Sequence, residues 1–253
     1  MITSIQNPKL KWVRTLLSKK SARYKEKVFV CEGVRLAEEA LAIQPDVPLV
    51  LFSSAISERG RALLERTNAD IYEVAPDLLD RISATEVSQG ILLVSSFISL
   101  PLPQQPDFLL LLDELRDPGN MGTIMRAAVA FNLQALLYTP GTVDPYSPKV
   151  VRSAMGAHFR LPLLQVVVED IPTVTKGTTS YLAEVNEGIP CWQADLTQPT
   201  TIIIGSEAHG ASQEVRKSAH HNLLIPMPGS MESLNAAMSA NIFLYEVNRQ
   251  RTA

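Results

Sequence analysis

The sequence predicts an α/β protein built from two domains. At 253 residues the chain exceeds the roughly 100 to 200 residues of a typical domain. Short apolar, β-rich runs alternate with helical patterns along most of its length. A stretch with three prolines and no periodicity, residues 99–106, separates two such series. We therefore expect an N-terminal domain over 1–98, a linker over 99–106 and a second domain over 107–253.

The N-terminal series contains four strand candidates, at 27–33, 47–53, 69–74 and 90–96. Helical patterns lie between them, at 34–42, 57–67 and 76–83. This alternation is typical of strands joined by crossover helices, so we expect a small α/β unit with parallel strands.

The second series begins with FLLLLDEL, an apolar run suited to a strand buried on both faces. Further strand candidates follow at 135–139, 163–168, 200–205 and 222–226, with helices between most of them. In an open parallel sheet, ligands bind at the carboxyl ends of the strands. The loops that follow these strands are therefore the places to look for a site.

The composition is that of an ordinary globular protein, with 46% hydrophobic and 19% charged residues. No run approaches the roughly 18 apolar residues of a membrane span, and the N-terminus lacks the apolar core of a signal peptide. Cys31 and Cys191 fit no C-x-x-C spacing, which favours a reduced, cytoplasmic setting. The four histidines fit no metal-ligand spacing, so we expect no metal.

The net charge of −3 conceals an asymmetry along the chain. Residues 1–35 hold nine Lys and Arg against two Glu, which leaves 14 basic against 24 acidic residues in the rest. A basic segment on an acidic body indicates a phosphate-bearing partner, although a solvated basic helix explains the pattern equally well.

The first strand end that could carry chemistry is LLDELRDPGNMGTIMRAA. Asp117, Pro118 and Gly119 form a turn, and Asn120 is a suitable N-cap for the helix that follows. Arg126 falls almost opposite the buried stripe of that helix. Because helical side chains lean toward the N-terminus, we expect Arg126 to lie back toward the loop at Asn120.

The second strand end is TTIIIGSEAHGAS. Gly205 and Gly210 allow close approach of a ligand to the backbone, and Glu207 stands at the carboxyl end of the strand. No Lys-Ser/Thr follows and the chain has no G-x-G-x-x-G, which excludes the common phosphate loops. The absence of a G-x-S-x-G elbow removes support for nucleophilic hydrolysis.

The third strand end is the loop that follows residue 225, with Pro226, Pro228 and Gly229. Ser233 is placed to cap the last helix. That helix carries apolar residues on more than one side, which predicts burial on two sides, with a second subunit as one explanation.

Together these segments resemble, in order and spacing, three motifs of the SpoU/TrmH-type RNA 2′-O-ribose methyltransferases of the SPOUT class. The first motif is met by Asn120, Gly122 and Arg126. The second is met by Gly205, Glu207, Gly210 and Ser212, and the third by Ile225, Pro226, Met227, Gly229, Ser233, Leu234, Asn235, Arg249, Gln250 and Arg251. A stretch between them also resembles the family through Lys149, Arg152 and Gly156, but Ala154 stands where many members have Ser.

The resemblance covers about residues 107–253 and implies a deep trefoil knot, homodimers and S-adenosylmethionine as cofactor. It implies cofactor contacts from Gly205, Ile225, Met227 and Leu234, with Gly210 and Asn235 beside them. The first hundred residues resemble, less specifically, the ribosomal-protein-like α/β/α domain with which many members bind substrate.

The resemblance further implies methylation of a ribose 2′-hydroxyl in structured RNA, with ribosomal RNA expected before transfer RNA. We expect Arg126 to hold an RNA phosphate and the hydroxyl in line, since a guanidinium stays protonated and is a poor base. Asn120, Glu207, Ser233 and Asn235 would shape the pocket around it. The expected RNA contacts are Lys9, Lys11, Arg14, Lys19, Lys20, Arg23, Lys149 and Arg152.

Two other classes stay open at this point. A non-catalytic RNA-binding protein could keep the fold, and it would not bind S-adenosylmethionine. An ordinary doubly wound nucleotide-dependent enzyme would need a phosphate loop, which the sequence lacks.

Overall fold

The computed structural model describes all residues except 86 and 253, and it divides the chain into two compact units. The first combines Met1–Ile98 with Asp144–Phe159, and the second combines Ser99–Val143 with Arg160–Ala253. The sequence placed residues 144–159 in the second domain, but in the structure this segment packs with the first unit.

The first unit contains a four-stranded sheet with helices on both faces. Its elements are α1 (Pro8–Ser18), α2 (Lys20–Glu26), β1 (Val28–Glu32), α3 (Val34–Ile43), β2 (Leu49–Phe52), α4 (Glu58–Leu64), β3 (Asp70–Glu73), α5 (Pro76–Ile82) and β4 (Ile91–Ser96), completed by α7 (Pro148–Ala154) and the 3₁₀ turn η1 (Ala157–Phe159). The strand order is β1-β4-β2-β3. The expectation of parallel strands was wrong for β4, which pairs antiparallel with both β1 and β2.

Both faces of this sheet are buried, as its strand sequences require. In β4, Leu93 faces one apolar cluster together with Phe29 and Val50. Its neighbour Leu92 faces the opposite cluster, together with Leu49. Because side chains alternate between the faces of a strand, a continuous apolar run supplies two cores at once.

A buried ion pair fixes segment 144–159 to the rest of the first unit. Asp144 Oδ2 accepts from Arg23 Nε at 3.1 Å and from Nη2 at 2.5 Å, and Asp144 Oδ1 accepts from the Tyr24 hydroxyl at 3.0 Å. Arg23 is only 4% exposed. Its guanidinium is therefore committed to the fold, and the expectation that Arg23 contacts RNA phosphate is corrected.

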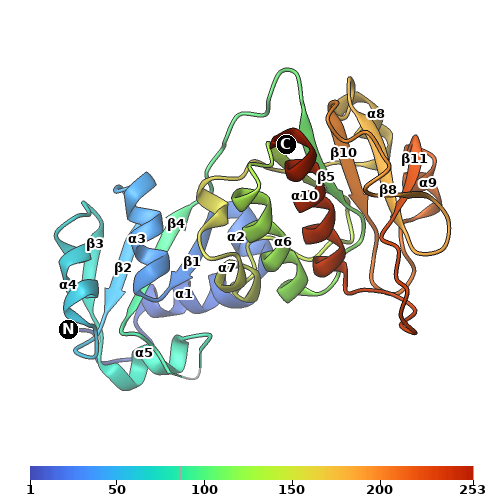
Figure 1. Cartoon of the computed structure of the whole chain (residues 1–253). Coiled ribbons are helices and arrows are strands. Elements are labelled where there is room, and N and C mark those ends of the chain that lie inside the picture. Colours follow the sequence, from blue (N-terminus) through green and yellow to red (C-terminus); the bar gives the residue numbers. More distant parts are fainter. Residues whose placement is uncertain (86, 253) are drawn as a thin grey trace. The chain divides into compact units, whose positions relative to one another are not determined.

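The second unit is built on a seven-stranded sheet whose order is β7-β6-β5-β10-β8-β11-β9. Figure 1 labels four of these strands, β5, β8, β10 and β11. Every strand pair in this sheet is parallel. Its elements are β5 (Phe108–Leu112), α6 (Pro118–Ala130), β6 (Ala135–Tyr138), β7 (Leu163–Gln165), η2 (Val168–Asp170), α8 (Ile171–Val174), β8 (Thr179–Glu184), β9 (Ile189–Pro190), β10 (Thr200–Ile204), α9 (Gln213–Arg216), β11 (His221–Leu224) and α10 (Ala236–Thr252). The sequence reading missed β8, which lies between β10 and β11, and the short β9.

Helix α10 closes the second unit by packing on α6 and β10. Ala240, Leu244 and Val247 are buried on this side. On its other apolar side, Met238 is 56% and Tyr245 54% exposed. Only one of the two sides expected to be buried is therefore covered within the chain.

Among the described residues, no helix is long and apolar enough to cross a membrane. Within the same residues, no group of His, Cys, Asp or Glu side chains is arranged to hold a metal ion.

Candidate active site

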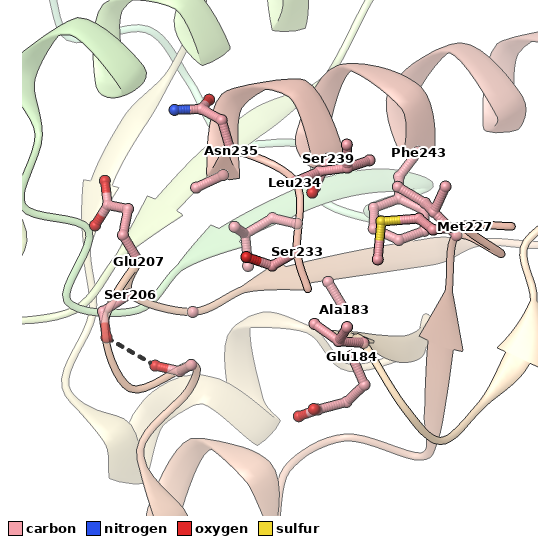
Figure 2. Close-up of a pocket in the computed structure, with 16 residues that line it drawn as sticks. Ala183, Glu184, Ser206, Glu207, Met227, Ser233, Leu234, Asn235, Ser239 and Phe243 are labelled. Carbon is pink, nitrogen blue, oxygen red and sulfur yellow. Dashed lines mark hydrogen bonds between the residues drawn. The ribbon is translucent and has the colours of Figure 1, made fainter. Parts of the chain in front are cut away.

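The carboxyl ends of three adjacent strands, β10, β8 and β11, open into a cavity of about 350 Å³ (Figure 2). The loops that leave these strands and the first turns of α10 form its walls. This is the position where a parallel sheet places a ligand site. Its volume lies within the range of small-molecule sites in proteins, about 300 to 1,000 Å³.

A chain of side-chain hydrogen bonds joins one residue from each of the three sequence motifs. Glu207 Oε1 accepts from Asn120 Nδ2 at 2.7 Å. Asn120 Oδ1 then accepts from Asn235 Nδ2 at 2.9 Å. These contacts use both ends of the Asn120 amide, so its orientation is set by the network. Segments distant in the sequence are thereby held together at the edge of the cavity.

Backbone groups complete this network. Glu207 also accepts from the backbone N–H of Arg116 at 3.3 Å and of Asp117 at 3.4 Å. Asn235 Oδ1 accepts from the N–H of Ala237 at 2.9 Å. The carboxylate of Glu207 therefore holds the loop after β5, and Asn235 satisfies the free N–H groups at the start of α10.

Two of the expected helix caps were misplaced by a few residues. Helix α6 is capped by Asp117, whose side chain accepts from the N–H of Asn120 at 2.7 Å. At α10 the capping side chain belongs to Asn235 rather than Ser233. Because Asp117 and Asn235 cap these helices, the side chains of Asn120 and Ser233 are not used as caps. Asn120 instead forms hydrogen bonds across the site, and Ser233 lines the cavity.

Gly205 is required by a close approach of two backbone segments. A Cβ atom at this position would lie 2.1 Å from the N atom of Ala211 and 2.2 Å from the carbonyl carbon of Gly210. Gly210 itself has φ = +67°, a left-handed conformation that favours glycine. The tight loop is closed by Ser206, whose hydroxyl donates to the Gly210 carbonyl at 3.0 Å (Figure 2).

Asp113 stabilises the loop that follows β10, and it was not identified as a site residue from the sequence. It is 2% exposed and accepts from the Thr139 hydroxyl and from the N–H of Ser212, each at 2.7 Å. It thus ties the ends of β5 and β6 to the loop after β10. The sequence feature that could have identified Asp113 is its position, as a carboxylate directly after the apolar run of β5.

The charged groups that line the cavity are the carboxylates of Glu184 and Glu207, and among its described lining residues no Lys, Arg or His occurs. Glu184, at the end of β8, forms an ion pair with Arg216. Figure 2 shows Glu184 and Glu207 projecting from different walls. Glu207 gives the cavity a carboxylate that has no ion-pair partner among the described residues, and Met227 and Phe243 give it apolar walls, which suits a ligand with a positive charge and an apolar part.

Most of the predicted cofactor and catalytic residues converge on this cavity. The predicted residues that line it are Gly205, Glu207, Gly210, Ile225, Met227, Ser233, Leu234 and Asn235. Asn120 reaches it through its hydrogen bonds. Arg126 does not line it: this side chain is exposed on α6, with no hydrogen bond or ion pair to any other described residue. Glu184 and Ser239 line it but were missed.

The predicted RNA contacts lie on the first unit, and those other than the buried Arg23 divide into three kinds. Lys11, Arg14, Lys19 and Lys20 are exposed on or beside α1 and α2, as Lys149 is on α7. Lys9 forms a 3.7 Å ion pair with Asp70. Arg152 lines a second cavity.

Comparisons with known proteins agree with this geometry. Residues 107–245 match the SpoU rRNA Methylase family, and residues 7–93 match the MRM3-like substrate binding domain. The chain is 32% identical to the 23S rRNA (guanosine(2553)-2′-O)-methyltransferase RlmP of Bacillus subtilis, over 97% of this chain and 98% of that enzyme. It is 33% identical to the 23S rRNA (uridine(2479)-2′-O)-methyltransferase of Streptomyces viridochromogenes, over 99% of this chain and 92% of that enzyme.

Among solved structures, the SpoU methyltransferase AviRb from Streptomyces viridochromogenes, in complex with the cofactor AdoMet, superposes with a TM-score of 0.88 at 30% identity. That match covers 98% of this chain and 99% of AviRb. The family match extends over more than half of the chain, and it includes all three loops of the hydrogen-bonded network. The chain therefore belongs to the SpoU rRNA Methylase family.

Proposed function

We propose that the protein transfers the methyl group of S-adenosylmethionine to a ribose 2′-hydroxyl of ribosomal RNA. The observation that carries the proposal is the network of Glu207, Asn120 and Asn235, which joins three motif loops beside a cavity lined by carboxylates. Similarity to two 23S rRNA 2′-O-methyltransferases over nearly the whole chain supports the reaction and the class of RNA.

The residues of the cavity fit S-adenosylmethionine. This molecule carries a sulfonium and an ammonium group, which suit a wall that holds the carboxylate of Glu207; Glu184 is already paired with Arg216. The glycine at position 205 lets the loop after β10 fold closely on itself beside the cavity, because a Cβ atom there would collide with the backbone of Gly210 and Ala211. Gly205, Ile225, Met227, Leu234 and Asn235 would hold the cofactor. When bound, S-adenosylmethionine supplies an electrophilic methyl group and its own leaving group.

The protein contributes alignment and charge to this reaction. Arg126 is exposed and uncommitted within the described part of the chain, so its five N–H donors are available to an RNA phosphate. A guanidinium on a phosphate next to the target ribose would fix the 2′-hydroxyl in line for attack. DNA lacks this hydroxyl, so RNA is the substrate that the chemistry selects.

A homodimer with a knotted catalytic domain belongs to the same proposal. The exposed Met238 and Tyr245 on α10 leave an apolar side that a second copy would cover, and Phe131 extends this side through its edge contact with Tyr245. The trefoil knot that the motif resemblance implies is part of the same proposal. Both cysteines are free and buried, in keeping with a cytoplasmic setting.

The test is methyl transfer by the Arg126→Ala variant. We expect at least a hundredfold loss of turnover on unmodified large-subunit rRNA, with S-adenosylmethionine affinity within twofold of wild type, because Arg126 is outside the cavity lining. The matched control is Lys217→Ala, an exposed cation of the same unit, which should transfer normally. Near wild-type turnover of Arg126→Ala would refute its role, and transfer to transfer RNA in place of rRNA would correct the substrate class.

A further inference from the structure

The loop that follows β10, residues 205–212, forms one wall of the candidate cofactor cavity. Four of its residues line the cavity. Ser206 and Gly210 exchange two backbone hydrogen bonds, of 2.8 and 3.0 Å, which close the base of the loop. The chain then passes through Ala211, which is 7% exposed, toward α9. The peptide group between Ala211 and Ser212 therefore determines where the closed loop lies relative to the rest of the second unit.

Side chains bind both polar groups of this peptide. Its N–H, which belongs to Ser212, donates to Asp113 Oδ2 at 2.7 Å. Its carbonyl, which belongs to Ala211, accepts from Arg216 Nε at 3.0 Å. Because backbone N–H and C=O groups are strong hydrogen-bonding groups, rotation of this peptide would break one bond or both. Asp113 and Arg216 thus set the orientation of the peptide.

These two side chains are held in turn by the strands on either side of β10. Asp113 directly follows β5, is 2% exposed and accepts from the Thr139 hydroxyl at 2.7 Å. Arg216, in α9, forms an ion pair with Glu184, the last residue of β8. Strands β5 and β8 are the two neighbours of β10 in the sheet. The peptide is therefore fixed to both flanking strands.

The pair of Glu184 and Arg216 also contacts the cavity wall. A Cβ atom at Gly210 would lie 3.0 Å from Arg216 Nη2, so the guanidinium packs directly against this lining glycine. Glu184 lines the same cavity (Figure 2). Ordering a loop at the moment of binding costs free energy, so a loop that is already held in its binding conformation gives higher affinity.

We propose that Asp113, Glu184 and Arg216 are positioning residues, which hold the loop after β10 in the conformation that binds S-adenosylmethionine. The inference rests on the proposed function, because it assumes that this cavity binds that cofactor. It assigns the three residues to cofactor affinity, acting through the peptide at Ala211, and gives them no part in the methyl-transfer step.

Calorimetric titration with S-adenosylmethionine tests this assignment. Asp113→Ala and Arg216→Ala should each bind about tenfold more weakly, since each loses a hydrogen bond to the peptide. Asp113→Asn should recover most of the affinity, because its amide oxygen can still accept from the Ser212 N–H. Arg59→Ala, which breaks an exposed ion pair in the first unit, is the control and should bind normally.

Turnover and ligand charge distinguish positioning from other roles. At saturating cofactor and RNA, turnover of the variants should stay within about twofold of wild type, since only binding is weakened. In Arg216→Ala the Glu184 carboxylate loses its partner and could act on the cofactor by its charge. S-adenosylhomocysteine lacks the sulfonium charge, so positioning predicts the same loss of affinity for both ligands. A change in affinity for only one of them would overturn the positioning role.

Wild-type affinity in both Asp113→Ala and Arg216→Ala would also overturn the inference. If Asp113→Ala fails to fold, Arg216→Ala decides, because the side chain of Arg216 is 38% exposed. A wild-type protein that binds no S-adenosylmethionine would contradict the proposed function, and the inference with it. Wild-type binding together with unaffected variants would contradict the inference alone.

Discussion

The two units each contain a cluster of polar side chains, and the clusters differ in burial. In the first unit, Arg23 and Asp144 are 4% and 8% exposed, and both oxygens of Asp144 accept hydrogen bonds. In the second, Glu207 and Asn235 are exposed at the edge of a cavity and joined through Asn120. The buried cluster stabilises the fold, whereas the exposed cluster can contact a ligand. Burial, more than residue type, separates the two roles.

The largest expected effect follows from breaking the buried cluster. Asp144→Ala leaves the Arg23 guanidinium buried without its counter-ion, which should lower the free energy of unfolding by about 3 to 5 kcal/mol. Chemical denaturation measures this loss. The matched control is Arg59→Ala, because the side chain of Arg59 is 69% exposed in its pair with Glu38. It should change the free energy of unfolding little, because solvent screens an exposed ion pair. Equal losses of unfolding free energy in the two variants would show that burial does not determine whether such an ion pair stabilises the fold.

The same unit should lose stability in mild acid because of His158. Burial lowers the pKa of His158 from 6.5 to about 4, although the Pro145 carbonyl and Asp144 oppose the shift. The unfolded chain therefore takes up a proton first, so the contribution is complete above about pH 6.5 and is lost as the pH falls toward 4. The predicted loss is about 3 kcal/mol.

Denaturation at pH 7, 5.5 and 4.5 compares wild type with His158→Gln. The variant should show the flatter pH dependence, because its side chain does not titrate. Parallel curves for the two proteins would rule out His158 as the source.

Breaking the exposed cluster should affect activity more than stability. Asn120→Ala removes both hydrogen bonds that join the three loops, one of them to a carboxylate. If the misaligned loops stabilise the transition state by about 1.5 to 3 kcal/mol less, methyl transfer should be roughly tenfold to a hundredfold slower. The free energy of unfolding should change by less than about 1 kcal/mol, since the group is near solvent. Asn68→Ala, which loses an exposed bond to Asp46, is the control and should transfer normally.

The smallest effect is expected at the glycine of the cavity loop. In Gly205→Ala the new methyl group meets the backbone of Ala211 and Gly210, so the loop must shift at a cost of about 1 to 3 kcal/mol. Calorimetric titration with S-adenosylmethionine should show at least tenfold weaker binding. In Gly229→Ala, where a Cβ meets nothing within 4 Å, binding should be normal. Full affinity in Gly205→Ala would show that the tight loop is dispensable.

Motif spacing predicted the composition of the exposed cluster well. Asn120, Glu207 and Asn235 were all assigned to the pocket through the resemblance to the family motifs, and in the structure hydrogen bonds join them. The hydrogen bonds between them depend on side-chain orientation, which spacing alone does not determine. The caps at Asp117 and Asn235 were displaced for the same reason, since several neighbouring polar residues could serve.

Other features depend on contacts that sequence patterns do not encode. Strand β8, TSYLAE, mixes helix-favouring Leu, Ala and Glu with a short buried centre, so its periodicity was weak and Glu184 at its end was missed. The direction of β4 is set by its neighbours in the sheet. Arg23 was counted among exposed cations because charge composition does not reveal that Asp144 lies against it.

The central claim is that the cluster of Glu207, Asn120 and Asn235 serves a ribose 2′-O-methyltransferase. The most direct measurement incubates the protein with methyl-labelled S-adenosylmethionine and large-subunit rRNA from cells that lack it, then maps the label by nucleoside analysis and primer extension. We predict label on a ribose 2′-oxygen at a single nucleotide, and a rate that falls at least tenfold in Asn120→Ala. Label on a base, or wild-type protein that transfers no label to rRNA, would contradict the account.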